Sequence, residues 1–359
     1  MHIADIRTPA MLLDLDRIEA NCRMMARRAH ALGVRLRPHV KTHKVPEIGR
    51  LQTASHFGGI TVSTIAEAHH FQAAGFTDIT LGVPVAPARA AEAVEMGLNL
   101  LVDSMEAIDA IEQATSSADA AAVWLKVDCG YGRAGVEPGG TAAVAIAERL
   151  ARHPTIAFAG LLTHGGHSYD CVGAESILAV AREERDSVLR CAERLRERGI
   201  EVEGISVGST STMMHVDHLD GVTEIRPGNY ALFDGFQAAI GSCEEDCIAG
   251  SVLATVLSVH ADRAIIDAGA LAMSKDSGTG TQHFGPILDL EGRPIGDLQL
   301  VGLSQEHGKV RGDGLERLSV GDTVRVPPNH SCLAMACFDR VHAVRDGVVE
   351  VVWSPCRGW

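Results

Sequence analysis

A basic run near the N-terminus, Arg37 to Lys44, contains the lysine with the clearest potential for chemistry, Lys41. The run follows an apolar-rich stretch, 33–36, and precedes a polar, helix-like segment that begins at Val45. This order places Lys41 near the end of an early strand, where a sheet presents side chains to a ligand. A desolvated lysine amine there can form an imine and can carry protons. Lys44 is the nearest competitor for that chemistry, and a solvated basic strand end is the structural alternative.

A histidine and a cysteine two residues apart, His330 and Cys332, form the second candidate centre. Side chains at positions i and i+2 of an extended segment point to one side, so we expect the pair to bind one metal ion together. Two protein ligands leave coordination positions open for water and substrate, as in a catalytic metal site. A thiolate ligand favours zinc, with manganese and magnesium as the alternatives. A histidine–cysteine pair on its own is weak evidence for a metal.

Polar residues that could bind a ligand follow several other strand-like runs, in loops that contain glycine. The candidates are Arg133, His164, Tyr169, Ser209, Thr210, Arg226, Gly228 and Asn229. Glycine lets backbone N–H groups approach an anion and hydroxyl groups donate further bonds, so the run 208–212 predicts a phosphate cradle. His167 can act as an acid or a base, because an imidazole titrates near neutral pH. For each loop alone, an ordinary structural turn is the alternative.

Apolar runs alternate with Ala- and Arg-rich helical patterns over the first two thirds of the chain. Strands are predicted at 34–38, 59–62, 79–81, 98–102, 123–127, 158–162, 205–207 and 224–227. Helices are predicted between them at 16–32, 64–74, 87–97, 105–114, 141–153 and 176–198. Eight strands with intervening helices over roughly 230 residues favour a (β/α)8 TIM-type barrel. An open doubly wound sheet is the alternative from the pattern alone.

The pattern changes after Gly241. Short β-branched runs, separated by turn residues, lie at 252–259, 264–267, 299–303, 323–326, 340–344 and 348–353. Such runs predict a second, mostly β domain. We therefore expect a barrel domain over residues 8–240 and a β domain over residues 241–359, and the second domain carries the histidine–cysteine pair.

Bulk composition narrows the range of partners. A chain of 359 residues exceeds one ordinary core, in agreement with two domains. The net charge of −14 argues against nucleic acid or an anionic membrane as a partner. The chain contains no apolar run of about 18 residues and its first residues lack a signal-peptide pattern, so we expect a soluble, cytoplasmic protein. The nine cysteines include no CxxC pair and are expected to be reduced thiols.

Together with the opening Thr8-Pro9-Ala10, the run from Arg37 to Lys44 resembles the fold-type III pyridoxal-phosphate (PLP) enzymes. Within them, the chain resembles the D-serine dehydratase and D-threonine aldolase branch. The resemblance covers essentially the whole chain, from the opening tripeptide to the histidine–cysteine pair. It implies an alanine racemase-like barrel and a β domain that also takes up residues 1–7. It also implies a homodimer in which each β domain completes the neighbour's site.

The resemblance implies a role for each residue around the cofactor ring. Lys41 would form the imine with PLP and later move the α-proton of the substrate. Arg133 would lie near the phenolic oxygen and favour the ionised phenolate. His164 would lie against the pyridine ring, and Tyr169 would line the pocket.

The resemblance also implies how the rest of the cofactor is held. Arg226 would face the pyridine nitrogen, and an always-charged donor there disfavours protonation of that nitrogen, which makes the cofactor a weaker electron sink. Gly228 and Asn229 would offer backbone N–H groups to the phosphate, beside the Ser/Thr-rich run 208–212. The family usually has proline where this chain has Ser211. We expect this departure to loosen the loop without removing a phosphate donor.

Two lyase reactions of a D-3-hydroxy amino acid fit this constellation. If Lys41 takes the α-proton and a metal polarises the 3-hydroxyl as a leaving group, the products are a 2-oxo acid and ammonia. If a base removes the hydroxyl proton instead, the Cα–Cβ bond breaks and releases glycine and an aldehyde. The pair His330 and Cys332 resembles the metal pair of D-serine dehydratase, whereas the aldolase branch typically has aspartate in place of the cysteine. We therefore expect dehydration of a D-serine-type or D-3-hydroxyaspartate-type substrate, with aldol cleavage as the alternative.

Two other classes fit the sequence less well. A racemase needs a second base opposite Lys41, commonly a tyrosine from the β domain, and the three tyrosines, 131, 169 and 230, all lie in the barrel half. A non-catalytic PLP carrier would be a barrel alone, without a second domain and a metal pair.

Overall fold

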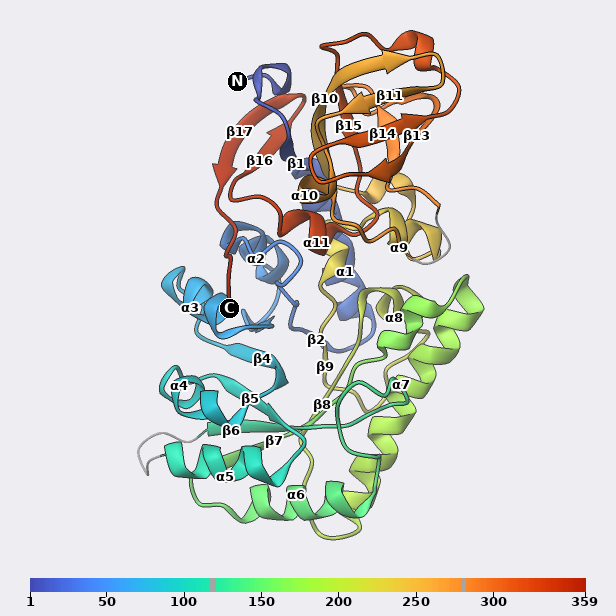
Figure 1. The fold of residues 1–359 in the computed structure, drawn as a ribbon. Helices are drawn as coiled ribbons and strands as arrows, with labels where there is room; N and C mark the ends of the chain where they lie inside the picture. The colour runs from blue at the N-terminus through green and yellow to red at the C-terminus, as the bar shows by residue number, and fades with distance from the viewer. Residues whose placement is uncertain (116–120, 279–281) are drawn as a thin grey trace. The chain divides into compact units, whose positions relative to one another are not determined.

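A computed structural model describes residues 1–115, 121–278 and 282–359 (Figure 1). The chain forms two compact units, each built from segments that are separate in the sequence. The first, which we call the barrel unit, comprises Met25–Lys41, Gly49–Gly228 and Gly358–Trp359. The second, which we call the β unit, comprises Met1–Met24, Thr42–Ile48 and Asn229–Arg357.

In the described part of the barrel unit, eight parallel strands form a sheet with the order β2-β9-β8-β7-β6-β5-β4-β3. They are β2 (Arg35–Leu36), β3 (Ile60–Val62), β4 (Ile79–Pro84), β5 (Asn99–Val102), β6 (Ala121–Lys126), β7 (Ile156–Leu162), β8 (Gly204–Val207) and β9 (Glu224–Ile225). A parallel bridge between His39 and Thr61 joins the two ends of this order, and Val40 N donates to Thr61 O at 2.9 Å. The sheet is therefore a closed barrel, and the predicted TIM-type architecture is confirmed.

Helices alternate with these strands, as predicted. They are α1 (Leu15–Ala31), α2 (Pro46–Thr53), α3 (Ile65–Ala73), α4 (Ala90–Glu95), α5 (Met105–Ala114), α6 (Thr141–Arg152), α7 (Ala174–Arg196) and α8 (Thr210–His215). Two of them begin with a side-chain cap: the Thr64 hydroxyl accepts from Glu67 N, and the Ser104 hydroxyl accepts from Ala107 N. Such caps satisfy N–H groups that have no partner within the helix. The short helix α8 was not predicted, because its six residues are too few to show a helical period.

Two glycines let strands β7 and β8 approach closely in the barrel core. Gly160 pairs with Gly204 in register, and its φ of +133° lies in a region open mainly to glycine. A Cβ atom on Gly160 would lie 2.0 Å from the Gly204 carbonyl oxygen. A Cβ atom on Gly204 would lie 2.6 Å from the Trp124 indole, which packs against Leu101 and Leu162. The space that these glycines leave is therefore filled by the tryptophan.

In the described part of the β unit, nine strands form a sheet with the order β11-β14-β13-β12-β15-β10-β1-β16-β17. They are β1 (Ala10–Asp14), β10 (Gly250–His260), β11 (Arg263–Ile266), β12 (Pro286–Leu288), β13 (Pro294–Leu303), β14 (Gly308–Arg311), β15 (Thr323–Val326), β16 (Val341–Arg345) and β17 (Val348–Trp353). Because β10 also pairs with β11, the antiparallel part from β11 to β10 closes on itself. The predicted mostly β domain is confirmed.

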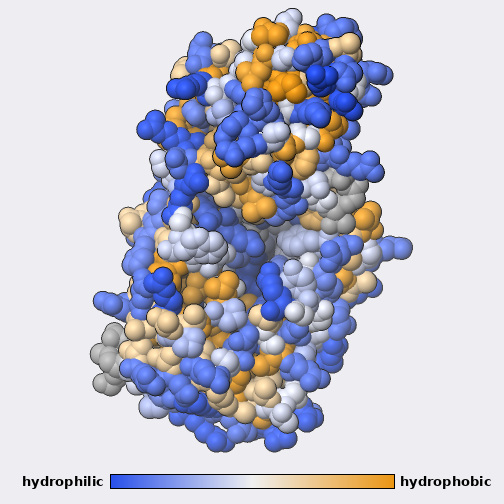
Figure 2. Space-filling view, in the orientation of Figure 1, coloured by the Kyte–Doolittle hydropathy of each residue, from blue (hydrophilic) through white to orange (hydrophobic). Residues whose placement is uncertain are grey.

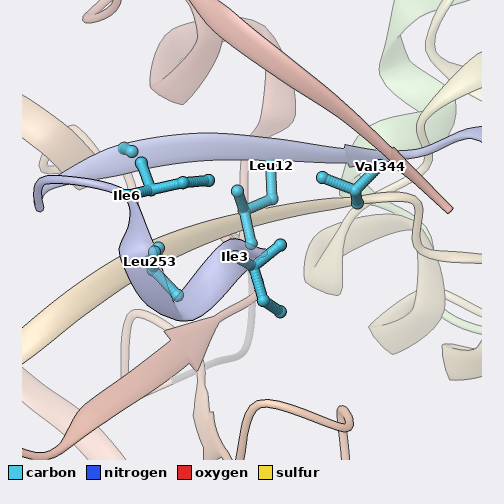
Figure 3. Packing of buried hydrophobic residues seen from close by; sticks show 6 residues of the cluster. Ile3, Ile6, Leu12, Leu253 and Val344 are labelled. Carbon is cyan, nitrogen blue, oxygen red and sulfur yellow. The ribbon is translucent and has the colours of Figure 1, made fainter. Parts of the chain in front are cut away.

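The N-terminal segment is part of this sheet. Strand β1 runs antiparallel to β10 and parallel to β16. The buried cluster around it contains Ile3, Ile6, Ala10, Leu12, Leu253 and Val344 (Figure 3). Strand β1 was not predicted, because its short apolar run leads directly into α1 and cannot be told from a helix start by periodicity alone.

The surface gives no sign of a membrane-spanning helix. Within the described ranges, no helix is both long and apolar enough to cross a bilayer. On the face shown in Figure 2, hydrophilic residues prevail and hydrophobic ones are scattered among them.

The domain boundaries given above, 8–240 and 241–359, stay a prediction.

Replacing Gly160 by alanine should lower the free energy of unfolding of the barrel unit by roughly 2 kcal/mol or more, since the added Cβ overlaps the backbone of β8. Urea-induced unfolding followed by tryptophan fluorescence, to which Trp124 contributes, measures the change. Gly97→Ala is the matched control: Gly97 also has a positive φ, but its added Cβ meets nothing within 4 Å, so a loss of about 1 kcal/mol is expected. Equal losses for the two variants would contradict the close strand approach.

Candidate active site

Lys41 lies in a turn just beyond the closing bridge of the barrel. Its backbone N–H donates to His39 Nδ1 at 3.4 Å, and His39 pairs with Thr61 of strand β3. The predicted place of Lys41, after the carboxyl end of an early strand, is therefore confirmed. Lys44, its competitor, has a left-handed backbone with φ of 54°, and its carbonyl accepts from Cys356 N at 2.9 Å.

Positively charged side chains surround His164, which follows strand β7. Burial lowers the pKa of His164 well below its usual value, and nearby positive charges add to the effect. Those charges belong to Lys126, Lys41, Arg133 and Arg226. His164 is therefore a neutral imidazole at neutral pH. The structure thus brings together several of the predicted cofactor-binding residues and adds Lys126.

Lys126, the last residue of β6, is the unexpected member of this group. It is 5% exposed, and its pKa is lowered to about 7, first by burial and then by the charge of Arg226. The carboxylate of Glu184 acts in the opposite direction. Positively charged side chains thus gather around His164, with Lys126 and Arg226 buried among them, an arrangement that suits an anionic ligand. PLP, with its phosphate and phenolate, fits this charge pattern.

Aromatic rings gather at the same strand ends. The ring centroids of Tyr131 and His164 lie 5.9 Å apart, and those of His164 and Tyr169 lie 6.4 Å apart. The ring of His167 lies 6.1 Å from that of Tyr131, whose face is covered by the Arg133 guanidinium at 5.0 Å. The predicted residues of these two loops therefore form one cluster of rings in contact, to which the structure adds Tyr131.

A chain of buried polar groups fixes the guanidinium of Arg226. Its Nη1 donates to Ser206 Oγ at 2.5 Å, and its Nη2 donates to the Thr163 carbonyl. The Ser206 hydroxyl donates in turn to Glu224 at 2.7 Å, and Glu224 accepts from Arg37 at 2.8 Å. Burial lowers the pKa of Arg226 to about 10 against the opposing charge of Glu224, so the guanidinium stays charged. Side chains and backbone from the barrel strands thereby set its direction.

Glu184, on helix α7, is a buried carboxylate that joins two loops. Its Oε1 accepts from Gly165 N at 2.6 Å and from Gly208 N at 2.9 Å. Gly165 follows His164, and Gly208 begins the Ser/Thr-rich run. The second oxygen, Oε2, is buried and has no hydrogen-bond partner among the described residues. One side chain thus holds both the loop that contains His164 and the predicted phosphate loop.

The Ser/Thr-rich run forms the start of helix α8. Ser209 caps the helix in a capping box with Thr212, and Thr210 is the first helical residue. Ser211 Oγ lies 2.7 Å from Ser168 Oγ, which also lies 3.3 Å from Ser209 Oγ. Ser211, where the resemblance leads us to expect proline, thus joins a cluster of hydroxyl groups from two loops.

The second predicted phosphate anchor, Gly228 and Asn229, lies where strand β9 leaves the barrel. A Cβ atom on Gly228 would lie 2.5 Å from the carbonyl oxygen of His39, so glycine is required there. The Asn229 side chain donates to Asp234 Oδ2 at 2.7 Å. The backbone of this turn is therefore fixed on both sides.

The predicted metal pair comes together in the β unit, but not on an extended segment. The expectation of an extended backbone is wrong, because Cys332 lies in the first turn of helix α11 (Ser331–Met335) and His330 is the residue before the helix. The helix starts here because Ser331 N donates to the buried carboxylate of Asp234 at 2.9 Å. The side chains of His330 and Cys332 are nevertheless hydrogen-bonded to each other.

Two more side chains contact the pair. Asp276 Oδ2 lies 2.6 Å from His330 Nδ1, and Thr42, the residue after Lys41, places its hydroxyl 3.2 Å from Cys332 Sγ. Burial acts to lower the pKa of His330, but the hydrogen bond and charge of Cys332, with Asp276, raise it to about 10. A carboxylate can only accept, so Nδ1 donates its hydrogen to Asp276. With this raised pKa Nε2 is protonated as well, so a metal that binds at Nε2 has to displace its proton.

The pair supplies only part of a coordination sphere. Across the described ranges, no group of three or more His, Cys, Asp or Glu side chains is arranged to hold a metal. A thiol and an imidazole in contact, with a carboxylate behind the imidazole, have the donor chemistry of a zinc site with two protein ligands. The residues present therefore fit a metal whose remaining positions are open to water or substrate.

Several supporting residues were missed by sequence reasoning. They are Lys126, Tyr131, Glu184, Asp234 and Asp276. The first two lie close to Arg133 in the sequence, Lys126 near the end of the predicted strand 123–127 and Tyr131 two residues before the arginine, so their types and positions were a usable signal. The three carboxylates lie among many similar acidic residues and carried no such signal.

The whole chain matches known proteins. Residues 13–234 match the family model of the alanine racemase N-terminal domain, and residues 249–344 match that of the serine dehydratase domain. The D-threo-3-hydroxyaspartate dehydratase of Delftia sp. (strain HT23) is 40% identical over 98% of each chain. The D-serine dehydratase of Dictyostelium discoideum is 33% identical over 99% of this chain and 98% of that protein. The D-threonine aldolase of Arthrobacter sp. is 34% identical over 98% of this chain and 93% of that protein.

The solved structures agree. The structure of the Delftia dehydratase matches this chain with a TM-score of 0.94 at 39% identity and covers 100% of both chains. A variant of that dehydratase has also been solved in a metal-free form. The chain therefore belongs to the alanine racemase-like family of PLP-dependent lyases that pairs an alanine racemase N-terminal domain with a serine dehydratase domain.

Proposed function

We propose that the protein is a PLP- and metal-dependent lyase that dehydrates a D-3-hydroxy amino acid to a 2-oxo acid and ammonia. The observation that carries this proposal is the combination of two sites in one chain. One is the group of positively charged side chains around His164, which includes the exposed Lys41 and Arg133 and the buried Arg226. The other is the contacting pair His330 and Cys332. The dehydratases among the relatives support a substrate of the D-threo-3-hydroxyaspartate or D-serine type.

The barrel unit is proposed to hold PLP, which when bound supplies an electron sink for charge that develops at the substrate α-carbon. Lys41 would carry the cofactor, and Arg226 would face its pyridine nitrogen. Arg133, His164 and Tyr169 would surround the ring. The phosphate would be held by Ser209, Thr210, Gly228 and Asn229.

Lys41 and His167 are the proposed proton carriers. A primary amine can take the α-proton of the substrate. His167 Nδ1 is buried and has no hydrogen-bond partner among the described residues, so this imidazole is available to give or take a proton. Water leaves when the 3-hydroxyl departs with one added proton, and the resulting enamine then takes up one water and hydrolyses to the 2-oxo acid and ammonia. Arg226 keeps its charge throughout, because its pKa of about 10 lies above neutral pH.

The β unit is proposed to hold a divalent metal that polarises the 3-hydroxyl of the substrate. Zinc is the proposed ion because a thiolate ligand favours it over manganese or magnesium, which are the alternatives. His330 would bind through Nε2, since its Nδ1 is engaged by Asp276. That contact orients the imidazole and strengthens it as a ligand.

Retro-aldol cleavage to glycine and an aldehyde is the second candidate. It is favoured by the D-threonine aldolase that matches 98% of this chain. The aldolase branch typically has aspartate at the position of Cys332, so the thiol favours dehydration. We further propose a cytoplasmic homodimer, with a barrel domain over 8–240 and a β domain over 241–359 that residues 1–7 join.

The function is tested by supplying the protein with PLP and Zn²⁺ and then with D-threo-3-hydroxyaspartate, D-serine and D-threonine in turn. Ammonia and a 2-oxo acid are the expected products, and Lys41→Ala should reduce their formation by orders of magnitude. Lys44→Ala is the matched control and should stay active. Glycine as the main product would favour the aldolase, and full activity in a strong chelator would contradict the metal's role.

Asp276→Ala should weaken Zn²⁺ binding roughly tenfold or more, since residues that orient a metal-bound histidine typically contribute that much. Competition with a chromophoric chelator, in the absence of substrate, measures the affinity. Asp339→Ala removes an exposed carboxylate that pairs with Arg357 and should leave Zn²⁺ affinity unchanged. Equal affinities for both variants would show that Asp276 does not orient the ligand.

Glu184→Met should weaken PLP binding about tenfold, because it leaves the buried N–H groups of Gly165 and Gly208 without an acceptor. Glu184→Gln keeps an oxygen acceptor without the charge and should bind PLP nearly as well as the wild type. The affinity is measured by titrating the cofactor-free protein and following cofactor absorbance. A Gln variant as weak as the Met variant would mean that the charge of Glu184 matters and the hydrogen bonds do not.

A further inference from the structure

Asp234 is a buried carboxylate in the β unit, and none of the cofactor or metal roles above uses it. It is 1% exposed. Its Oδ1 accepts from Gln237 N at 2.9 Å and caps helix α9 (Gly235–Ala239). Its Oδ2 accepts from two groups far apart in the chain, Asn229 Nδ2 at 2.7 Å and Ser331 N at 2.9 Å. A single oxygen atom thus joins the proposed phosphate anchor to the residue between the proposed metal ligands.

Helix capping accounts for only one of the two oxygens. A serine or asparagine caps a helix as well as aspartate does, without a buried negative charge. Burying a carboxylate is unfavourable unless hydrogen bonds compensate for lost hydration. The Asn229 and Ser331 donors on Oδ2 provide that compensation. The second oxygen of the carboxylate is therefore not needed for the helix cap and serves to connect Asn229 with Ser331.

The segments on either side of Asp234 are held in one conformation. Phe233 has a φ of 49°, a left-handed conformation that is strained for a non-glycine residue. The Ser331 hydroxyl donates to the Phe233 carbonyl. Gly235 N donates to Pro328 O at 3.1 Å, and a Cβ atom on Gly235 would lie 2.6 Å from Asn329 Oδ1. Residues 233–236 and 328–331 are therefore fastened side by side with little freedom to shift.

We propose that Asp234 is a positioning residue that sets the phosphate anchor at Asn229 and the metal-ligand turn at His330–Cys332 together. The proposal rests on the proposed function, which assigns PLP to the first and a metal to the second. Ser331 lies between the two ligands, so its N–H bond to Asp234 fixes the backbone that directs both side chains. Asn229 follows Gly228, so its side-chain bond to Asp234 fixes the backbone N–H groups offered to the phosphate. Loss of Oδ2 therefore weakens both binding events.

The test uses Asp234→Asn and Asp234→Ser in the full-length protein. Both replacements keep an oxygen that can cap α9, and both remove the acceptor for Asn229 and Ser331. Zn²⁺ affinity is measured by chelator competition, and PLP affinity is measured separately by absorbance. We expect each affinity to fall roughly tenfold or more. With Co²⁺ in place of Zn²⁺, the thiolate-to-cobalt absorption band should shift, because the direction of Cys332 changes.

Three control variants distinguish a joint effect of Asp234 on both sites from the loss of one site alone and from a general loss of stability. Asp276→Ala should weaken Zn²⁺ alone, and Glu184→Met should weaken PLP alone. Gln237→Met changes a buried side chain in the same helix without touching the carboxylate, and should leave both affinities and the Co²⁺ band unchanged. Losses in Gln237→Met equal to those in the Asp234 variants would reduce Asp234 to a stabilising residue and overturn the proposal.

The remaining outcomes distinguish the two proposals. If the wild type binds PLP and Zn²⁺ and the Asp234 variants match it, only the link is overturned. A loss of Zn²⁺ affinity without a loss of PLP affinity also overturns it, because the anchor at Asn229 would then be independent. If the wild type binds neither PLP nor Zn²⁺, the proposed function itself is overturned.

Discussion

Buried positive charge without an equal amount of buried negative charge is the condition on which the barrel site depends. Lys126 and Arg226 lie in the interior at the strand ends, and their pKa values are lowered there by burial. Such desolvation is unfavourable, and the protein compensates it only in part, through the buried carboxylates of Glu184 and Glu224 and through the bonds that fix Arg226. An anionic cofactor would supply the missing charge. The arrangement therefore reduces the stability of the barrel by itself and favours binding of an anion, a trade that is common at functional sites.

The sequence predicted the barrel because parallel strands buried on both faces are short, continuous apolar runs, and these stand out between helical patterns. Lys41 was predicted from its place near the end of an early strand, whereas the roles of Arg133 and Arg226 came from the resemblance to fold-type III PLP enzymes. Strand β1, whose apolar run merges with α1, was missed. The predicted contact between His330 and Cys332 was correct, but the predicted extended backbone was wrong. An i, i+2 spacing cannot show that Ser331 binds a carboxylate nearly a hundred residues earlier in the chain, and that bond is what starts α11.

The residues that hold the site in place could not be found from the sequence, for a physical reason. Glu184, Asp234 and Asp276 act by accepting hydrogen bonds from partners that only the fold brings near. In the sequence each is one acidic residue among many, and nothing in its neighbours shows that it will be oriented or buried. A reactive residue can be recognised in the sequence from its residue type. A residue that orients it can be recognised only from the contacts that it makes in the folded protein. Ser211 illustrates the same limit, because its bond to Ser168 replaces the rigidity expected of a proline.

The position of β1 has a consequence for how the chain folds as it is made. This strand emerges well before both of its neighbours in the sheet, β10 and its parallel partner β16. The helices and strands of the barrel unit can pair while the ribosome is still adding residues, but β1 must wait for a partner at a very large sequence separation. Contacts of that kind form slowly, because a long loop has to close first. During that wait, the apolar side chains of Ile3, Ile6 and Leu12 are without their final packing partners, so nascent chains that stall before β16 are those most exposed to aggregation and to chaperone binding.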